Sequence, residues 1–229
     1  MPCAPLGLID RLCNGGLFGC TLCLGADGND FVPIAQELDL TPVGAVRFVF
    51  PHAPARPVTI NGGYVMRAWY DILGTELGAG PQRREDEAGL RESQALVEGL
   101  IANERARGIP AARIVLAGFS QGCAVTFMTG LRHGERLAGL LGMSGYLPLA
   151  ATTAAERNSA NAGVPIFQAH GSADPMIVIA RAAQSRDALL ALGYPVEWHA
   201  YPMAHSVCPQ EIADMNHWLL RVLAAPRGE

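Results

Sequence analysis

The sequence predicts an α/β fold in which a mostly parallel central sheet is flanked by helices. Short apolar runs of strand length alternate with longer helical patterns, and most of these runs lack strict apolar–polar alternation. Strands buried on both faces read as continuous apolar runs, and repeated strand–helix alternation is typical of a parallel sheet. Since no internal repeat or linker divides the 229 residues, we expect one domain.

Apolar and β-branched runs mark the expected strands. Most of them begin or end near glycine or proline, which is typical of strand boundaries. The runs cover residues 46–50, 113–117, 137–143, 165–169 and 196–201, and residues 21–24 form a shorter candidate for a first strand.

Three helical patterns lie between or after these runs. Residues 87–107 place Leu90, Val97 and Ile101 on one face, and the pattern stops at a glycine. Residues 177–192 also stop at a glycine, and residues 211–223 close the chain with a similar apolar face.

Residues 51–81 differ from the rest of the chain. Prolines and glycines interrupt this stretch, and Tyr64, Trp69 and Tyr70 lie among them. Long connections in compact domains are commonly functional, so we expect a lid-like loop that forms a pocket wall.

Composition and charge exclude several function classes. Half of the residues are apolar, 17% are charged and the formal net charge is −4, with no basic run to favour nucleic acid or an anionic membrane. No apolar run reaches the length of a spanning helix, and the apolar patch at 12–24 lacks the basic flank of a signal peptide. We therefore expect a cytoplasmic protein without stable membrane insertion.

The six cysteines do not form a metal-site pattern. Cys20 and Cys23 make a C-x-x-C pair, but no second ligand pair at suitable spacing accompanies it. We expect unrelated, reduced thiols rather than a zinc or redox site.

The strongest chemical motif is Gly-Phe-Ser-Gln-Gly at residues 118–122, which fits the G-x-S-x-G nucleophile elbow. An apolar strand runs into it and an apolar helical stretch, 124–131, follows it. Glycines flank the serine because side chains two residues before and after it would collide in the strained turn. Ser120 is therefore the candidate nucleophile of an α/β-hydrolase.

A nucleophilic serine needs a base and an acid that orients the base. In this fold the chain order is Ser, Asp or Glu, then His, each on a loop after a strand. Asp174 follows the strand at 165–169 and is the expected acid; the alternative role is an N-cap ahead of Pro175. Of the six histidines, His205 alone lies between the last strand and the last helix, so it is the expected base.

An oxyanion hole needs two backbone N–H donors. Gln121, directly after the nucleophile at a helix start, supplies one candidate. The glycine-rich stretch 24–28 follows an early strand, and its Leu24 supplies the other.

These residues lie in a chain that resembles the carboxylesterase/acyl-protein thioesterase (phospholipase/carboxylesterase) family. The resemblance covers about residues 24–223. It rests on residues 24–31 (LGADGNDF), 51–59 (PHAPARPVT), 69–71 (WYD), 117–122 (AGFSQG) and on His205 with Ser206.

The resemblance implies an α/β-hydrolase without metal or cofactor, often a homodimer, that acts on small esters, lysophospholipids or S-acyl proteins. It also implies apolar substrate contacts, carried over at Met66, Leu73, Tyr146 and Met176. We expect a serine carboxylesterase that hydrolyses short- to medium-chain esters through an acyl-enzyme. The alternatives are an acyl-protein thioesterase or lysophospholipase, and a weakened hydrolase or acyl-pocket binding protein.

The chain departs from the family pattern before and after the elbow. Leu22 and Cys23 replace the usual His-Gly of the oxyanion loop, and Cys123 stands where a glycine often follows the elbow. Upstream of Leu24 the resemblance ends, so we divide the chain into an atypical segment, 1–23, and a single hydrolase domain, 24–229.

Overall fold

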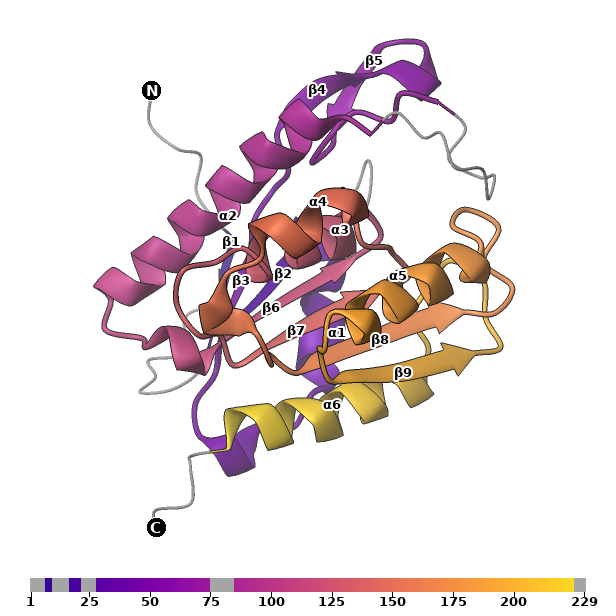
Figure 1. The fold of residues 1–229 in the computed structure, drawn as a ribbon. Coiled ribbons are helices and arrows are strands. Elements are labelled where there is room, and N and C mark those ends of the chain that lie inside the picture. The colour runs from indigo at the N-terminus through magenta and orange to yellow at the C-terminus, as the bar shows by residue number, and fades with distance from the viewer. Residues whose placement is uncertain (1–6, 10–16, 22–27, 75–84, 225–229) are drawn as a thin grey trace.

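The computed structural model describes residues 7–9, 17–21, 28–74 and 85–224, and a seven-stranded sheet forms its centre (Figure 1). The strand order is β1-β3-β2-β6-β7-β8-β9, and β1 alone runs antiparallel to its neighbour in this sheet. The mostly parallel α/β fold predicted from the sequence is confirmed. The strands are β1 (Gly7–Ile9), β2 (Leu17–Thr21), β3 (Arg47–Phe50), β6 (Ile114–Phe119), β7 (Gly139–Met143), β8 (Ile166–Gly171) and β9 (Val196–Tyr201).

Helices cover both faces of the sheet in the described part of the chain. Side chains of α2, α3 and α5 pack on one face with Ile114 and Leu116, while α1 and α6 pack on the other with Val115 and Ala117. Alternate residues of β6 therefore enter two separate cores, which explains its continuous apolar run. The helices are α1 (Val32–Glu37), α2 (Glu87–Ala106), α3 (Gln121–Gly130), α4 (Ala150–Glu156), α5 (Ile179–Ala191) and α6 (Pro209–Leu223).

The first parallel strand begins earlier than predicted. The strand expected at 21–24 is β2, at Leu17–Thr21, and residues 22–27 lie outside the described residues. Backbone pairing decides its position, because β2 lies between β3 and β6 with Leu17 opposite Ile114. Both β1 and β2 fall within the segment 1–23 that the sequence separated from the hydrolase domain.

The segment at 51–81 was expected to be a loop, but it contains a β-hairpin. Strands β4 (Ala55–Val58) and β5 (Tyr64–Arg67) pair antiparallel and form a separate two-stranded sheet. Gly62 and Gly63 have φ values of 66° and 80°, a conformation that favours glycine, and so permit the turn between the strands. In Figure 1 the hairpin lies beyond the N-terminal end of α2.

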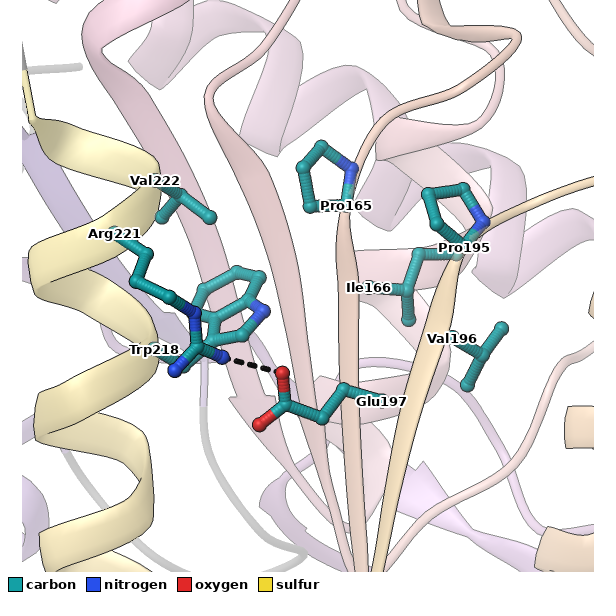
Figure 2. Close-up of a pocket in the computed structure, with 8 residues that line it drawn as sticks. All are labelled: Pro165, Ile166, Pro195, Val196, Glu197, Trp218, Arg221 and Val222. Carbon is teal, nitrogen blue, oxygen red and sulfur yellow. Dashed lines mark hydrogen bonds and ion pairs between the residues drawn. The ribbon is translucent and has the colours of Figure 1, made fainter.

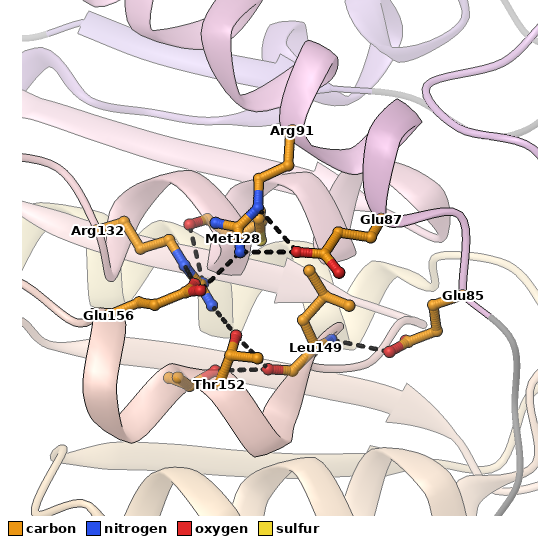
Figure 3. A network of polar contacts seen from close by, with 9 residues as sticks. Glu85, Glu87, Arg91, Met128, Arg132, Leu149, Thr152 and Glu156 are labelled. Atoms are coloured by element: carbon orange, nitrogen blue, oxygen red, sulfur yellow. Dashed lines mark hydrogen bonds and ion pairs between the residues drawn. The ribbon is translucent and has the colours of Figure 1, made fainter.

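A network of ion pairs and hydrogen bonds holds α4 against α2 and the end of α3 (Figure 3). The Glu156 carboxylate accepts hydrogen bonds from Arg91 at 2.6 Å and from Arg132 at 2.7 Å. These contacts, that of Arg91 above all, lower the pKa of Glu156 to about 2. The carboxylate therefore stays ionised and links three helical elements across the range of neutral pH.

Glu211 is a fully buried carboxyl group in the first turn of α6. Burial raises its pKa to about 8, against the smaller opposing effect of the Cys208 backbone N–H, and the charge of Asp214 adds to the increase. The folded protein thus holds a proton on Glu211 at pH 7, whereas the unfolded chain releases it.

This difference predicts a pH-dependent stability. A pKa raised on folding contributes stability that is complete below about pH 4.5 and is lost as the pH rises to about 8. Glu211→Gln cannot ionise, so its melting temperature should fall less than that of the wild type between pH 5 and pH 8. Over this pH range, ionisation of Glu211 should lower the wild type's free energy of unfolding by on the order of 3 kcal/mol. Thermal unfolding at a series of pH values measures it.

Glu37→Gln, at an exposed position at the end of α1, is the matched control. This variant should keep the wild-type pH dependence. Parallel stability curves for Glu211→Gln and the wild type would contradict the prediction.

Candidate active site

Ser120 lies in a sharp turn between β6 and α3. Its φ of 56° is uncommon for a residue with a side chain, so the surrounding structure must hold it in place. A Cβ atom on Gly118 would lie 2.1 Å from the Gly122 carbonyl oxygen. The strand and the helix therefore approach each other closely enough to require glycine, as the motif predicted.

Cys123 fits into a space created by two further glycines. A Cβ atom on Gly145 would lie 2.3 Å from the Cys123 Cβ, and one on Gly142 would lie 2.7 Å from its Sγ. The thiol is completely buried, and burial raises its pKa. The departure from glycine after the elbow is thus accommodated by packing, and the thiol remains neutral.

The structure brings Asp174 and His205 together. The Nδ1 atom of His205 lies 2.7 Å from Oδ2 of Asp174, and the carboxylate is buried. Its other oxygen, Oδ1, accepts the backbone N–H groups of Met176 at 2.8 Å and Ile177 at 2.9 Å. These bonds orient the carboxylate to accept Nδ1–H of His205, and in a neutral imidazole with this tautomer Nε2 carries the lone pair.

The loops that carry these two residues are fastened to each other. The Ala173 N–H donates to the Met203 carbonyl at 3.1 Å. A Cβ atom on Gly171 would lie 2.2 Å from the Ala204 carbonyl oxygen, so glycine permits this approach. The His205 ring also packs on Phe119, at 4.7 Å between centroids, which places His205 beside the elbow.

His170 is a neighbour of this pair whose contribution the sequence did not reveal. Its Nε2 donates to the Ile177 carbonyl at 2.7 Å and lies 3.4 Å from Oδ2 of Asp174. Burial lowers the pKa of His170, so the ring is neutral and adds no charge beside Asp174. Its position at the end of β8, four residues before Asp174, is the sequence signal that could have identified it.

Gln121 is the first residue of α3, where backbone N–H groups are not used inside the helix. Its buried side-chain amide accepts the Trp69 N–H at 3.0 Å and donates to the Tyr70 carbonyl at 2.9 Å. Leu24, the other expected oxyanion donor, lies outside the described residues.

The expected substrate contacts differ in exposure. Tyr146 is buried, and its hydroxyl lies 2.8 Å from that of Tyr70. Met66 is partly buried on β5, whereas Leu73 and Met176 are 38% and 57% exposed. Met176 adjoins the acid directly, because its own N–H donates to Asp174.

A groove of about 450 Å³ lies at the amino ends of β8 and β9 (Figure 2). Pro165 and Pro195, just before β8 and β9, line it together with Trp218 of α6. Asp174 and His205 follow the carboxyl ends of these two strands, and Ser120 follows the carboxyl end of β6. The groove is therefore separate from the candidate active site.

The described part of the chain contains neither a candidate metal cluster nor a candidate membrane span. No group of three or more His, Cys, Asp or Glu side chains there could hold a metal ion. Within the same residues, no helix has the length and hydropathy needed to cross a membrane.

Comparison with known proteins identifies the family. A family model described as phospholipase/carboxylesterase matches residues 23–223. The chain is 40% identical over 200 residues to acyl-protein thioesterase 1 of Yarrowia lipolytica, covering 86% of this chain and 87% of that protein. It is also 40% identical over 216 residues to acyl-protein thioesterase 1 of Mycosarcoma maydis, covering 88% and 89%.

A solved structure supports the same assignment. The crystal structure of Arabidopsis thaliana SOBER1 is 27% identical and covers 91% of this chain and 99% of its own, with a TM-score of 0.82. The sequence resemblance and the predicted α/β-hydrolase fold are both confirmed. The chain belongs to the phospholipase/carboxylesterase family of α/β-hydrolases and is a serine hydrolase.

Proposed function

We propose that this hydrolase is an acyl-protein thioesterase, which removes fatty acyl groups from cysteine side chains of proteins. The observation that carries the proposal is its 40% identity, over most of both chains, to proteins named acyl-protein thioesterase 1. Hydrolysis of small carboxylic esters, the function first expected from the sequence, becomes the second candidate. The family description, phospholipase/carboxylesterase, favours that candidate.

In the proposed acylation step, Ser120 Oγ attacks the carbonyl carbon of the thioester. His205 Nε2 takes the hydroxyl proton, and Asp174 stabilises the resulting imidazolium through its 2.7 Å contact with Nδ1. The tetrahedral intermediate then collapses, the carbon–sulfur bond breaks and His205 returns the proton to the departing thiolate. An acyl-Ser120 ester remains.

Deacylation repeats these steps with water. His205 removes a proton from the water, the hydroxide adds to the acyl carbon, and collapse of the intermediate breaks the bond to Ser120 Oγ. The proton returns to Ser120, and the fatty acid leaves. No cofactor enters either step.

Backbone N–H groups would stabilise the negative oxygen in both steps. Gln121 supports this role because it begins α3, where the helix dipole favours negative charge. Leu24 remains a proposal from the sequence.

Two of the proposed acyl contacts, Tyr146 and Met176, follow the carboxyl ends of β7 and β8. Tyr146 would form a fixed wall because it is buried and hydrogen-bonded to Tyr70. The exposed apolar side chains of Leu73 and Met176 would gain contact with an acyl chain and lose contact with water. Met66 would extend this apolar surface along β5.

One prediction separates thioester from ester hydrolysis. Two peptides that carry the same octanoyl group, one on a cysteine sulfur and one on a serine oxygen, should differ in kcat/KM, with the thioester favoured. Ser120→Ala should lose about 10⁴-fold or more of both activities, because the attacking oxygen is absent. Steady-state release of the free peptide measures both.

The exposed Ser159 supplies the matched control, and Ser159→Ala should keep wild-type kinetics. A higher kcat/KM for the ester would favour the carboxylesterase candidate instead. A wild-type protein that neither hydrolyses these peptides nor reacts with a fluorophosphonate probe would be a binding protein of the acyl pocket.

Another prediction concerns the candidate acid, Asp174. Asp174→Asn should lower kcat by about 10³- to 10⁴-fold, because an amide NH₂ facing Nδ1 favours the wrong histidine tautomer. The variant should remain folded, with little change in the melting temperature measured by circular dichroism, so unfolding does not explain the loss of kcat. Asp187→Asn, at an exposed ion pair with Arg186, is the control and should remain fully active. Wild-type turnover by Asp174→Asn would contradict the proposed mechanism.

A further inference from the structure

Residues 69–71, here called the strap, connect the β-hairpin to the candidate active site. Trp69 and Tyr70 are buried, yet the strap belongs to neither sheet, so its backbone polar groups need partners elsewhere. Side chains of two helices provide them. Gln121 of α3 binds the Trp69 N–H and the Tyr70 carbonyl, while Ser93 of α2 donates to the Trp69 carbonyl.

The two helices contact the strap through residues that differ in their sequence separation from the elbow. Ser93 lies in the second turn of α2 and is remote in sequence from the elbow. Gln121 directly follows Ser120, and its own backbone N–H is the proposed oxyanion donor. One residue therefore binds the strap with its side chain and would bind the oxyanion with its backbone.

The strap also contacts the proposed acyl wall. The Tyr70 hydroxyl lies 2.8 Å from that of Tyr146, and the Arg181 guanidinium lies over the Tyr146 ring, 3.2 Å from its centroid. A continuous set of contacts thus runs from the wall at Tyr146, through Tyr70, to the Gln121 side chain. Each of these side chains except Arg181 is at least nine-tenths buried, so none can shift without moving its neighbour.

We propose that Gln121 is a positioning residue that couples the acyl wall to the oxyanion donor. The proposal rests on the proposed function. Its two hydrogen bonds keep the Ser120–Gln121 peptide in fixed orientation to the strap, which the oxyanion site requires. An acyl chain that packs on the wall stabilises the strap, and this binding energy then appears in kcat as well as in KM.

The coupling predicts how chain length affects the kinetics. With p-nitrophenyl esters from acetyl to octanoyl, kcat of the wild type should rise with chain length. Gln121→Met keeps the side-chain volume and loses both hydrogen bonds. In this variant the rise in kcat should disappear, octanoyl kcat should fall on the order of 10-fold to 10²-fold, and KM should still fall with chain length.

Ser93→Ala distinguishes the proposed coupling from a merely structural role of Gln121. This variant removes a strap contact that does not involve the elbow, so the rise of kcat with chain length should persist, although stability falls. Equal loss of the rise in both variants would mean that any loosening of the strap suffices, and would overturn the proposal. A wild-type rise retained by Gln121→Met would overturn it as well.

A measurement on the wild type keeps the proposal testable if Gln121→Met fails to fold. Coupling is reciprocal, so occupation of the oxyanion site should stabilise the strap. Hydrogen exchange of a peptide covering residues 69–71 should slow after a small alkyl fluorophosphonate reacts with Ser120. Unchanged exchange there would contradict the coupling, with a peptide covering residues 159–161 as the reference.

The two proposals fail separately. One result would contradict the thioesterase function alone. In it, the wild type prefers esters to thioesters, but its ester kcat rises with chain length and that of Gln121→Met does not. Preference for the thioester with identical chain-length profiles in the wild type and Gln121→Met would contradict the coupling alone.

Discussion

The close backbone approach at the elbow is the constraint on which the active end of the molecule depends. With φ at 56°, Ser120 turns the chain from β6 directly into α3, and Gly118 meets the carbonyl of Gly122 where no Cβ could fit. This turn sets where α3 begins and therefore where Gln121 lies. The β8 and β9 loops bring Asp174 and His205 together, and the His205 ring packs on Phe119, the residue directly before Ser120.

Much of the sheet could be predicted because its strands are buried on both faces. β6 alternates between two cores, so each of its residues is apolar or glycine and the run is easily recognised. The hairpin could not be predicted in the same way. β4 and β5 lie on a partly exposed surface, with Tyr64 68% exposed, and their apolar pattern does not distinguish strand from loop. β2 was misplaced because its bounds depend on pairing with distant strands.

In the candidate site, too, some residues could be predicted from local sequence signals and others could not. Ser120, Asp174 and His205 could be selected by motif, chain order and placement after strands, all of which are local signals. The side-chain bonds of Gln121 could not, because they join residues 51 and 52 positions apart and depend on how the hairpin folds back. The place of the neutral His170 beside Asp174 could not be predicted either, since its contact with the Ile177 carbonyl exists only in three dimensions.

The packing of Cys123 affects how this enzyme tolerates chemical stress. Thiols are oxidised and alkylated as thiolates, and a sulfur atom three residues after a nucleophilic serine would ordinarily be a vulnerable position. Here Gly142 and Gly145 enclose the thiol and burial keeps it protonated. Oxidants and alkylating reagents therefore have neither access to this sulfur nor a reactive form of it, and the elbow is protected from damage by the same glycines that let the cysteine fit.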